Sequence, residues 1–259
     1  MTLNKDLRIK IARIVKNSGE GHIPSCFSIV DIISFLYEKV LKFKPNQPDW
    51  IDRDYFVLSK GHGSGALYVV LEKNNFINNE QLISYSLKGS ILGGHPDSTK
   101  VPGVEASTGS LGHGISTAIG IALGLKIKNM KNRVFCLVGD GECHEGTIWE
   151  AANIARNLNL SNLCVIIDWN GSAAQLMPKD DLPEKWKAFG WDMFQISGHS
   201  NEEMHKIFNN LNFNSNSNPK AVLAKTIKGK GVSFIEGHGK WHHKIPNDLE
   251  MELILKELK

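Results

Sequence analysis

An aspartate between two glycines and a distant asparagine are the residues of this chain best suited to bind a metal ion. Gly139-Asp140-Gly141 directly follows one apolar run, and Asn170 follows the next. Carboxylate and amide oxygens are hard ligands of the kind that Mg²⁺ prefers, and Mg²⁺ usually takes its remaining ligands from water and substrate phosphate. The glycines would let the backbone approach phosphate oxygens closely. A lone Gly-Asp-Gly is more often a simple turn, but together with Asn170 it indicates a clamp for a metal ion and a diphosphate.

Two buried strands joined by a helix would position both residues. The apolar runs 133–138 and 163–167 predict strands buried on both faces, and 145–158 has apolar residues at helical spacing. Such a unit forms one right-handed crossover, so Asp140 and Asn170 should emerge at the same edge of adjacent strands. Open α/β sheets bind their ligands at this edge.

The rest of the pattern predicts an α/β fold, doubly wound, with a mostly parallel sheet and helices on both faces. Further strands are expected at 55–58 and 221–226. Further helices are expected at 6–16, 29–41, 66–72, 115–126 and 248–259, and after a capping box at 200–203. Residues 88–109 should form a long irregular connection, often a sign of function, and 209–218 a plain loop. We expect residues 1–259 to form a single domain.

Composition and charge exclude several functional classes. With 41% hydrophobic and 22% charged residues the chain can bury a sizeable core, and its net charge of +3 is too small to indicate nucleic-acid binding. It has no apolar signal core near Met1 and no membrane-spanning stretch of about 20 apolar residues. Four cysteines without Cys-x-x-Cys spacing favour free core thiols in a reducing compartment. We therefore expect a cytoplasmic enzyme that binds neither nucleic acid nor membrane.

Four histidines in or beside glycine loops are a second group of candidates. His22, His62 and His95 each have a neighbouring glycine, and His242 lies in the sequence Trp-His-His-Lys. Histidines in such loops are poorly placed for core packing, although each alone could be an ordinary surface residue. Imidazole can donate and accept protons near neutrality, which suits acid–base chemistry. Their spacing does not suit a zinc site.

These motifs together resemble the amino-terminal half of the transketolase family. The segment from Asp140 to Gly146, with Asn170, is similar to the transketolase version of the thiamine diphosphate signature. The other matching motifs, in family order and approximate spacing, are Ser59-Lys-Gly-His62-Gly, Gly93-Gly-His95-Pro-Asp97, Thr108-Gly109-Ser-Leu111-Gly-His-Gly114 and Lys225-Thr-Ile-Lys-Gly-Lys-Gly231. The resemblance covers nearly the whole chain. It implies the thiamine diphosphate-binding fold, in its diphosphate-binding (PP-type) form.

The resemblance also implies a site. Mg²⁺, for which Ca²⁺ or Mn²⁺ can substitute, would be bound by Asp140, Asn170 and the backbone carbonyl of Ser172. The catalytic residues implied, which would bind the oxygens of the sugar, are His22, His62, His95 and His242. His242 is preferred to His243 because family members carry one histidine after the tryptophan. The implied ligands of thiamine diphosphate are His62, Gly109, Leu111, Gly114, Gly139, Asp140, Gly141, Glu145 and Asn170.

Some positions have a second interpretation or depart from the family. Glu145 matches a glutamate near the family's dimer interface, but it could equally be a first-turn glutamate favoured by the helix dipole. His113 and Ser110 replace the usual glutamine and proline, which could alter substrate preference. Residues 171–178 replace a segment that usually contains an Asp-Gly turn, and the loop before Lys185 is several residues short. Substrate contacts made by that loop cannot be carried over.

A partner chain is the last implication of the resemblance. In transketolases a glutamate that activates the cofactor, and the groups that grip the sugar phosphate, lie in a pyrimidine-binding domain. We expect that domain on a carboxy-terminal transketolase subunit, in an α2β2 assembly. The implied reaction transfers a two-carbon ketol unit from a ketose or ketose phosphate to an aldose. The alternatives are a noncatalytic cofactor-binding homologue and the α subunit of a 2-oxo acid dehydrogenase (E1-type), against which Lys60-Gly-His62 and Gly94-His95-Pro argue.

Overall fold

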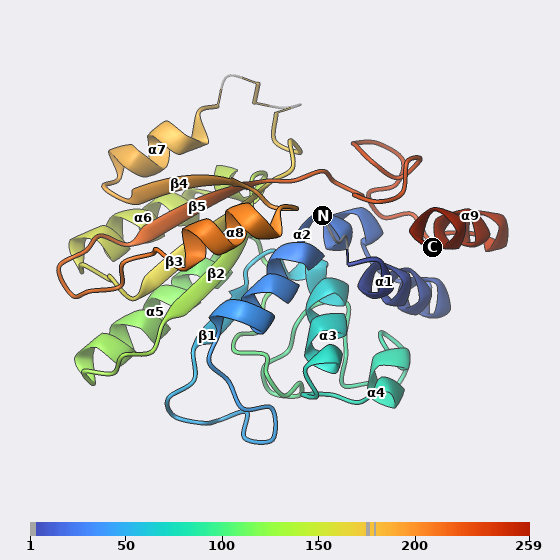
Figure 1. Ribbon diagram of the computed structural model, residues 1–259, viewed down its shortest axis with the longest axis horizontal. Coiled ribbons are helices and arrows are strands. Elements are labelled where there is room, and N and C mark those ends of the chain that lie inside the picture. Colours follow the sequence, from blue (N-terminus) through green and yellow to red (C-terminus); the bar gives the residue numbers. More distant parts are fainter. Residues whose placement is uncertain (1–3, 175–176, 179) are drawn as a thin grey trace.

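A parallel sheet runs through the centre of the molecule (Figure 1). The computed structural model describes residues 4–174, 177–178 and 180–259. Within these residues every strand pairing is parallel. The strands lie in the order β1 (Tyr55–Leu58), β2 (Val134–Gly139), β3 (Leu163–Trp169), β5 (Lys220–Lys225) and β4 (Asp192–Ser197). The predicted α/β fold with a parallel sheet is confirmed.

Helices cover both faces of this sheet, because alternate residues of each strand point to opposite sides. In β2, Phe135 and Leu137 belong to one hydrophobic core, whereas Cys136 and Val138 belong to the other. The first core is covered by α1 (Lys5–Ser18), α2 (Ile23–Phe35), α3 (Ser64–Lys73), α4 (Asn79–Ile83), α8 (Asn201–Phe208) and α9 (Asp248–Leu258). The second is covered by α5 (His113–Ile127), α6 (Gly146–Asn157) and α7 (Leu182–Ala188). The predicted double winding is therefore confirmed.

The predicted helix 29–41 was wrong at both ends. Helix α2 begins at Ile23 and ends at Phe35, and a π-helical turn follows over Leu36–Val40. Every residue of α2 is buried, so no polar face marks where it starts. Pro24 in the first turn is compatible with a helix start, since its missing N–H would have no partner there.

The other predicted helices and strands are present, with ends that agree to within about two residues. The sequence prediction missed α4, α7 and β4. Helix α4 is a single short turn, and β4 is a partly exposed edge strand without clear alternation. Among the described residues no helix is long and apolar enough to cross a membrane.

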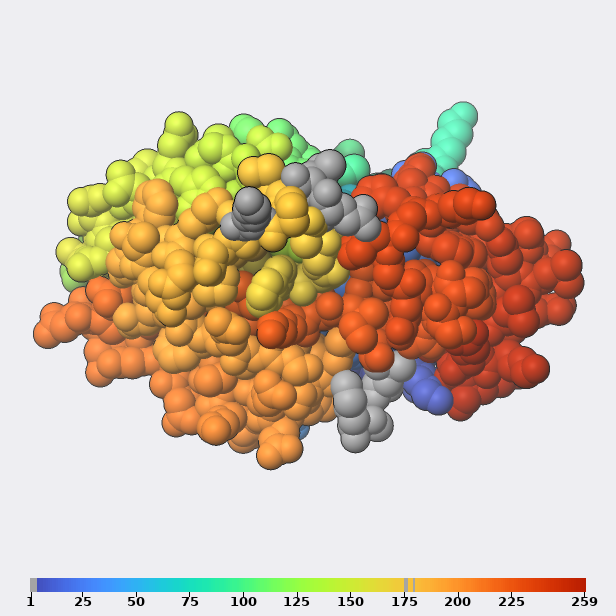
Figure 2. Space-filling model, turned by 90° about the horizontal axis from the view of Figure 1, so that it is seen from above, coloured from blue at the N-terminus to red at the C-terminus, as the bar shows by residue number. Residues whose placement is uncertain are grey.

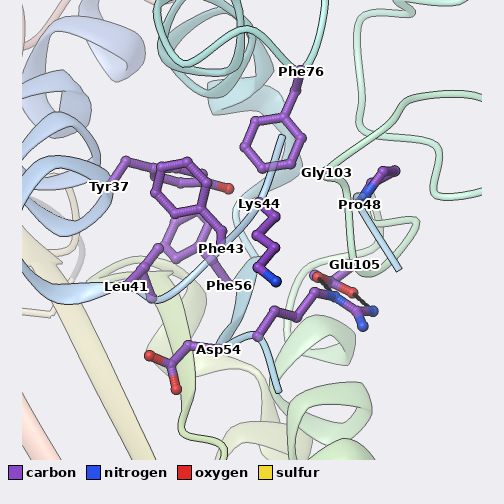
Figure 3. Close-up of a pocket in the computed structure, with 11 residues that line it drawn as sticks. Tyr37, Leu41, Phe43, Lys44, Pro48, Asp54, Phe56, Phe76, Gly103 and Glu105 are labelled. Atoms are coloured by element: carbon purple, nitrogen blue, oxygen red, sulfur yellow. Dashed lines mark hydrogen bonds and ion pairs between the residues drawn. The ribbon is translucent and has the colours of Figure 1, made fainter. Parts of the chain in front are cut away.

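The irregular connection 88–109 is tied to the loop before β1. Arg53 donates two hydrogen bonds to Glu105, of 2.7 Å from Nε and 2.8 Å from Nη2. Figure 3 shows this ion pair beside an aromatic cluster, in which Tyr37, Phe43 and Phe76 contact one another. The cavity between these side chains measures only about 10 Å³, room for roughly one water molecule. These tightly packed side chains, together with the Arg53–Glu105 pair, therefore hold in place the connection that carries His95.

Candidate functional site

The predicted metal residues lie at the carboxyl ends of β2 and β3. Gly139 of β2 pairs with Asp168 of β3, so Asp140 and Asn170 follow just beyond that pair. The prediction that these two residues leave adjacent strands at one edge is confirmed. They share a cavity of about 140 Å³. The cavity is lined by Ser25, Lys60, His62, Leu111, Gly139, Asp140, Gly141, Glu142, Asn170, Ser172, Lys228 and His242.

Asp140 is a buried carboxylate with few partners. Its Oδ1 accepts a hydrogen bond of 2.8 Å from the Gly141 N–H. Its Oδ2 accepts only a long hydrogen bond of 3.5 Å from the Ala173 N–H. Burial, and next the charge of Asp168, raise the pKa of Asp140. Burying an ionised carboxylate is costly unless a cation or strong donors compensate it. A divalent ion bound at Asp140 would supply that compensation, so this position fits a metal ligand.

Asp168, to which the sequence pattern assigned no role, accepts hydrogen bonds from four side chains beside the cavity. Its Oδ2 accepts from Lys60 Nζ at 2.6 Å, and from Ser28 Oγ and Asn170 Nδ2 at 2.9 Å. Thr226 Oγ1 donates to the other oxygen. Burial acts to raise the pKa of Asp168, but the Lys60 ammonium and these hydrogen bonds hold it below its usual range. Asp168 thus stays charged and orients both Lys60 and Asn170.

Ser172 lies directly beside Asn170. The Asn170 Oδ1 accepts from the Ser172 N–H at 3.0 Å and from its hydroxyl at 2.5 Å. Gly171 between them has φ +81°, a left-handed conformation that favours glycine. The three predicted metal residues therefore come together, offering one carboxylate, one amide and one carbonyl oxygen. Mg²⁺ takes about six ligands, so phosphate and water oxygens would have to complete its shell.

Glu142 is a second buried acid that the sequence did not single out. Its Oε1 accepts from Ser59 Oγ at 2.5 Å and from the Gly112 N–H at 2.9 Å, and its Oε2 accepts from the Gly139 N–H at 3.0 Å. Burial raises the pKa of Glu142, while these three bonds act to lower it. Glu142 joins the end of β1, the start of α5 and the end of β2. No local pattern reveals this role, because two of its three donors, Ser59 and Gly112, come from distant segments.

The predicted glycine loop packs tightly between β1 and α5. A Cβ atom at Gly114 would come within 2.6 Å of the Ser59 Cα, and one at Gly109 within 3.4 Å of the His95 ring. Leu111 lines the cavity. These close approaches bring the N-terminus of α5 to the end of β1, and the N-terminus of a helix suits an anion. Glu145 is different, since it is exposed at the start of α6 and lies outside the cavity lining.

Three of the four predicted catalytic histidines form a cluster at the cavity. The ring centroid of His22 lies 5.3 Å from that of His62 and 5.6 Å from that of His242. Burial, and then Lys60, lower the pKa of His62 to about 2. Burial, and then the neighbouring histidines, lower the pKa of His22 to about 4. Both imidazoles are therefore neutral near pH 7, and each can donate one hydrogen bond and accept another.

His242 reaches the cavity from the segment after β5. Its Nδ1 lies 3.1 Å from Lys228 Nζ, and burial followed by that ammonium lowers the pKa of His242. Because an ammonium can only donate, Nδ1 is the acceptor and Nε2 carries the proton. His243 does not line the cavity, but its ring lies 4.6 Å from that of His22. The choice of His242 over His243 stays a prediction.

His95 lies apart from this cluster. Its side chain is exposed and does not line the cavity, although its charge contributes to the lowered pKa of His22. Its backbone carbonyl accepts from the Tyr68 hydroxyl at 3.1 Å, which anchors the loop to α3. The structure therefore brings His95 to the edge of the site rather than into the cavity.

A buried polar network fixes the segment that carries Lys228. His199 Nε2 accepts from the Ile227 N–H at 3.0 Å, and His199 Nδ1 lies 2.8 Å from Asp31 Oδ2. Asp31 also pairs with the fully buried Arg8 at 2.7 Å. Figure 2, which looks onto the molecule from above, shows the segment after β5 in orange-red covering much of one half of that face. The network therefore ties α1 and α2 to the segment that carries Lys228.

Comparison with known proteins gives a consistent result. A family model described as "Transketolase, thiamine diphosphate binding domain" matches residues 2–257. A subunit of the apulose-4-phosphate transketolase of Phocaeicola vulgatus is 38% identical over 256 residues, covering 97% of this chain and 90% of that protein. The 6-deoxy-6-sulfo-D-fructose transketolase subunit SqwG of a Clostridium species is 38% identical over 224 residues, covering 85% of this chain and 81% of that protein.

Solved structures show the same likeness over part of a longer chain. The crystal structure of transketolase from Campylobacter jejuni matches with a TM-score of 0.90 and 29% sequence identity. The match covers 97% of this chain and 41% of that chain. This chain thus spans about two fifths of the solved transketolase, but nearly the full length of the Phocaeicola vulgatus relative.

Proposed function

We propose the following role on the basis that this chain belongs to the transketolase family. It is the thiamine diphosphate-binding subunit of a split transketolase, which transfers a two-carbon ketol unit from a ketose phosphate to an aldose. The observation that carries this proposal is one cavity in which Asp140 and Asn170 lie beside His62 and His242. Relatives of similar length that are named as transketolase subunits favour this function over the 2-oxo acid dehydrogenase alternative.

Asp140, Asn170 and the Ser172 carbonyl would hold Mg²⁺ against the diphosphate. The poorly compensated carboxylate of Asp140 supports this assignment, as does the proximity of Asn170 and Ser172. The N-terminus of α5 would meet the diphosphate oxygens with backbone N–H groups. Bound thiamine diphosphate supplies a carbon nucleophile for cleavage and formation of the ketose carbon–carbon bond.

The histidines would act on the oxygens of the sugar. His22 and His62 are neutral, so each can donate a hydrogen bond to a carbonyl oxygen or accept one from a hydroxyl. His242 would donate from Nε2, because Lys228 occupies Nδ1. These groups would assist proton transfer at the oxygens attached to the two carbons of the breaking carbon–carbon bond. His95 would join them from the edge of the site.

A second polypeptide would complete the active site. The relatives of similar length that are named as transketolase subunits support such a partner. We propose a carboxy-terminal transketolase subunit with the pyrimidine-binding domain and its activating glutamate, in a symmetric assembly of two copies of each chain. The exposed position of Glu145 at the start of α6 is compatible with a place at the interface between the chains.

Reconstitution tests this proposal. The purified chain alone should bind thiamine diphosphate weakly and transfer no ketol unit, and adding the partner subunit should create activity with a ketose phosphate donor. Replacing the activating glutamate of the partner should abolish activity without separating the subunits, as size-exclusion chromatography can check. Robust transfer by a homogeneous preparation of this chain alone would contradict the split-enzyme proposal.

We also propose that the enzyme works in the reducing cytoplasm. The four cysteines are all free and buried. Burial raises the pKa of the Cys26 thiol to about 11 and that of Cys164 to about 12. Such thiols stay protonated and unreactive, as expected of core residues in a reducing compartment.

A further inference from the structure

A cavity larger than the one at Asp140 has no part in the proposed function. It measures about 600 Å³, which lies within the range of roughly 300–1,000 Å³ that is typical of small-molecule sites. Three connections line it, and each leads into a strand: 128–133 before β2, 158–162 before β3 and 209–219 before β5. Figure 1 shows the end of α5 and the connection before β5 at the same end of the sheet, on the left. We call this space the amino-end cavity.

The amino-end cavity is separate from the proposed cofactor site. Arg133 lines it and directly precedes β2, whereas Asp140 directly follows β2 and lines the other cavity. The six residues of β2 lie between them. At the rise of a strand this is a distance of roughly 20 Å. Among the described residues none lines both cavities, so a ligand in one would leave the other free.

The amino-end cavity is positively charged. Lys126, Lys131 and Arg133 line it, and none of the described residues in its wall is acidic. Arg133 is neutralised, because its Nη2 lies 2.6 Å from Asp54 Oδ2. Lys126 is held in place by hydrogen bonds of 2.8 and 3.0 Å that its Nζ donates to two backbone carbonyls just after α6. In the described part of the chain no acid pairs with Lys126 or Lys131, so both charges are available to an anion.

A third ammonium group lies just behind the wall of the cavity. Lys220 is 1% exposed, and its Nζ donates to the Ser161 carbonyl at 2.6 Å and to Ser217 Oγ at 2.8 Å. The same Nζ lies 4.8 Å from the ring centroid of Phe213, which lines the cavity. Burial lowers the pKa of Lys220 to about 8. A nearby anion would favour the charged form of Lys220, which would add to the attraction for that anion.

The rest of the wall suits a planar ring with polar edges. Met130 and Phe213 provide apolar surface. The side-chain amides of Asn129 and Asn214 each carry donors and an acceptor, and the described residues offer them no hydrogen-bond partner. Inorganic phosphate or a sugar phosphate would leave the apolar surface uncovered, whereas a neutral ring would leave the lysines without an anion. A ligand that combines phosphate with an aromatic ring uses both parts of the wall.

We propose that the amino-end cavity binds a nucleoside diphosphate, with its phosphates at Lys126 and Lys131 and its base against Met130 and Phe213. Lysine binds phosphate as a point charge, and bases stack on aromatic and apolar side chains. The charge of the two phosphates matches the lysines of the wall together with Lys220 behind it. This inference does not rest on the proposed function, because it concerns the opposite edge of the sheet.

Calorimetry of the purified chain with ADP tests the proposal. Mg²⁺ is omitted, so that Mg²⁺-dependent binding at Asp140 does not contribute. ADP should bind at one site per chain, Lys131→Ala should raise its Kd by about 10-fold, and Lys131→Glu should raise it further. Lys131 is exposed, so both variants should fold, as equal melting temperatures can check. Lys256→Ala is the matched control, an exposed lysine of α9 that should leave the Kd unchanged.

Fragments of ADP test the two parts of the wall separately. Adenosine lacks the phosphates, inorganic diphosphate lacks the base, and ribose 5-phosphate replaces the base by a sugar hydroxyl. Each should bind more weakly than ADP by about 10-fold or more, a difference of 1.4 kcal/mol. Inorganic diphosphate or ribose 5-phosphate bound as tightly as ADP would overturn the assignment of a nucleotide.

A last comparison separates this site from the cofactor site. ADP binding should persist in Asp140→Ala, and in wild-type chain saturated with thiamine diphosphate and Mg²⁺. Loss of ADP binding in either case would place ADP at the cofactor site and overturn the proposal. A Kd for ADP above about 1 mM, or one that Lys131→Glu leaves unchanged, would overturn it as well. Neither result would bear on the proposed ketol transfer.

Discussion

The proposed metal end and the proposed substrate end of this site are built in different ways. At the metal end, Asp140, Asp168 and Glu142 are 1%, 0% and 2% exposed, and each follows or ends a strand. At the proposed substrate end, His95 and His242 are exposed and come from irregular segments. Buried hydrogen-bonded groups hold one geometry, whereas exposed loop side chains move among several. Under the proposed function, the chain would therefore pre-organise the residues that bind the diphosphate and leave part of substrate recognition to the partner subunit.

Among these predictions, disrupting the Lys60–Asp168 pair should have the largest effect on the proposed metal end. Asp168→Ala should lower the free energy of unfolding by about 3–5 kcal/mol, because it leaves the buried Lys60 ammonium without its partner. It should also abolish cofactor binding, because Asn170 loses the bond that orients it. Urea denaturation measures the first effect and calorimetry the second. His205→Ala is an exposed control, and an Asp168→Ala chain as stable as wild type would contradict the central place given to Asp168.

Substitution of Asp140 tests the proposed metal end while leaving the hydrogen bonds of Asp168 and Glu142 in place. Asp140→Ala should abolish Mg²⁺-dependent binding of thiamine diphosphate in the partnered complex, since it removes the one anionic ligand proposed. Asn170→Ala should weaken binding in the same way. Calorimetry on the folded variants measures both affinities. Unchanged cofactor affinity in Asp140→Ala would reject the assignment.

The metal-free chain provides the control for this variant. Burial raises the folded-state pKa of Asp140, so ionising it costs the folded chain free energy. This cost begins as the pH rises above the ordinary pKa of an aspartate and grows until the pH has passed the raised pKa. Asp140→Asn should therefore raise the melting temperature of the metal-free chain by a few degrees at pH 7 and have less effect at low pH. A stabilised chain that no longer binds the cofactor would separate binding from folding.

The histidines should give the smaller, purely kinetic effect. His62→Ala and His95→Ala should each lower turnover by about 10² or more, the scale of a lost acid–base or hydrogen-bonding group, with little change in cofactor affinity. Steady-state kinetics of the reconstituted complex with saturating cofactor measures this. The exposed position of His95 sharpens the test, because its effect should appear only when the proposed partner subunit is present. Turnover of either variant within twofold of wild type would remove it from the mechanism.

The sequence predicts the sheet well, and with it the meeting of Asp140 and Asn170 at one edge, because both follow from local patterns. The apolar runs ending at Gly139 and before Asp168 identify two adjacent strands, and their parallel register then places Asp140 and Asn170 together. The start of α2 was not predictable from periodicity, since a helix buried on all sides has no polar face.

The supporting network could not be read from the sequence. Lys60 and Asp168 are far apart in the chain, as are Glu142 and Ser59, and nothing in their local sequences marks them as partners. Family resemblance named the histidines, but it could not show that His95 stays outside the cavity while His243 contacts His22. Pairings of this kind depend on tertiary packing rather than on spacing along the chain.

The hydrogen bonds to Glu142 have a consequence for local unfolding around this site. The Glu142 carboxylate accepts hydrogen bonds from the backbone N–H groups of Gly112 and Gly139 and from the hydroxyl of Ser59. Movement of any one of these three segments would therefore displace the acceptor that the other two share. Local unfolding proceeds in cooperative units when contacts are shared in this way. We therefore expect the loops at the ends of β1 and β2 and the first turn of α5 to exchange their amide hydrogens as one unit, and a bound diphosphate to slow the exchange of all three together.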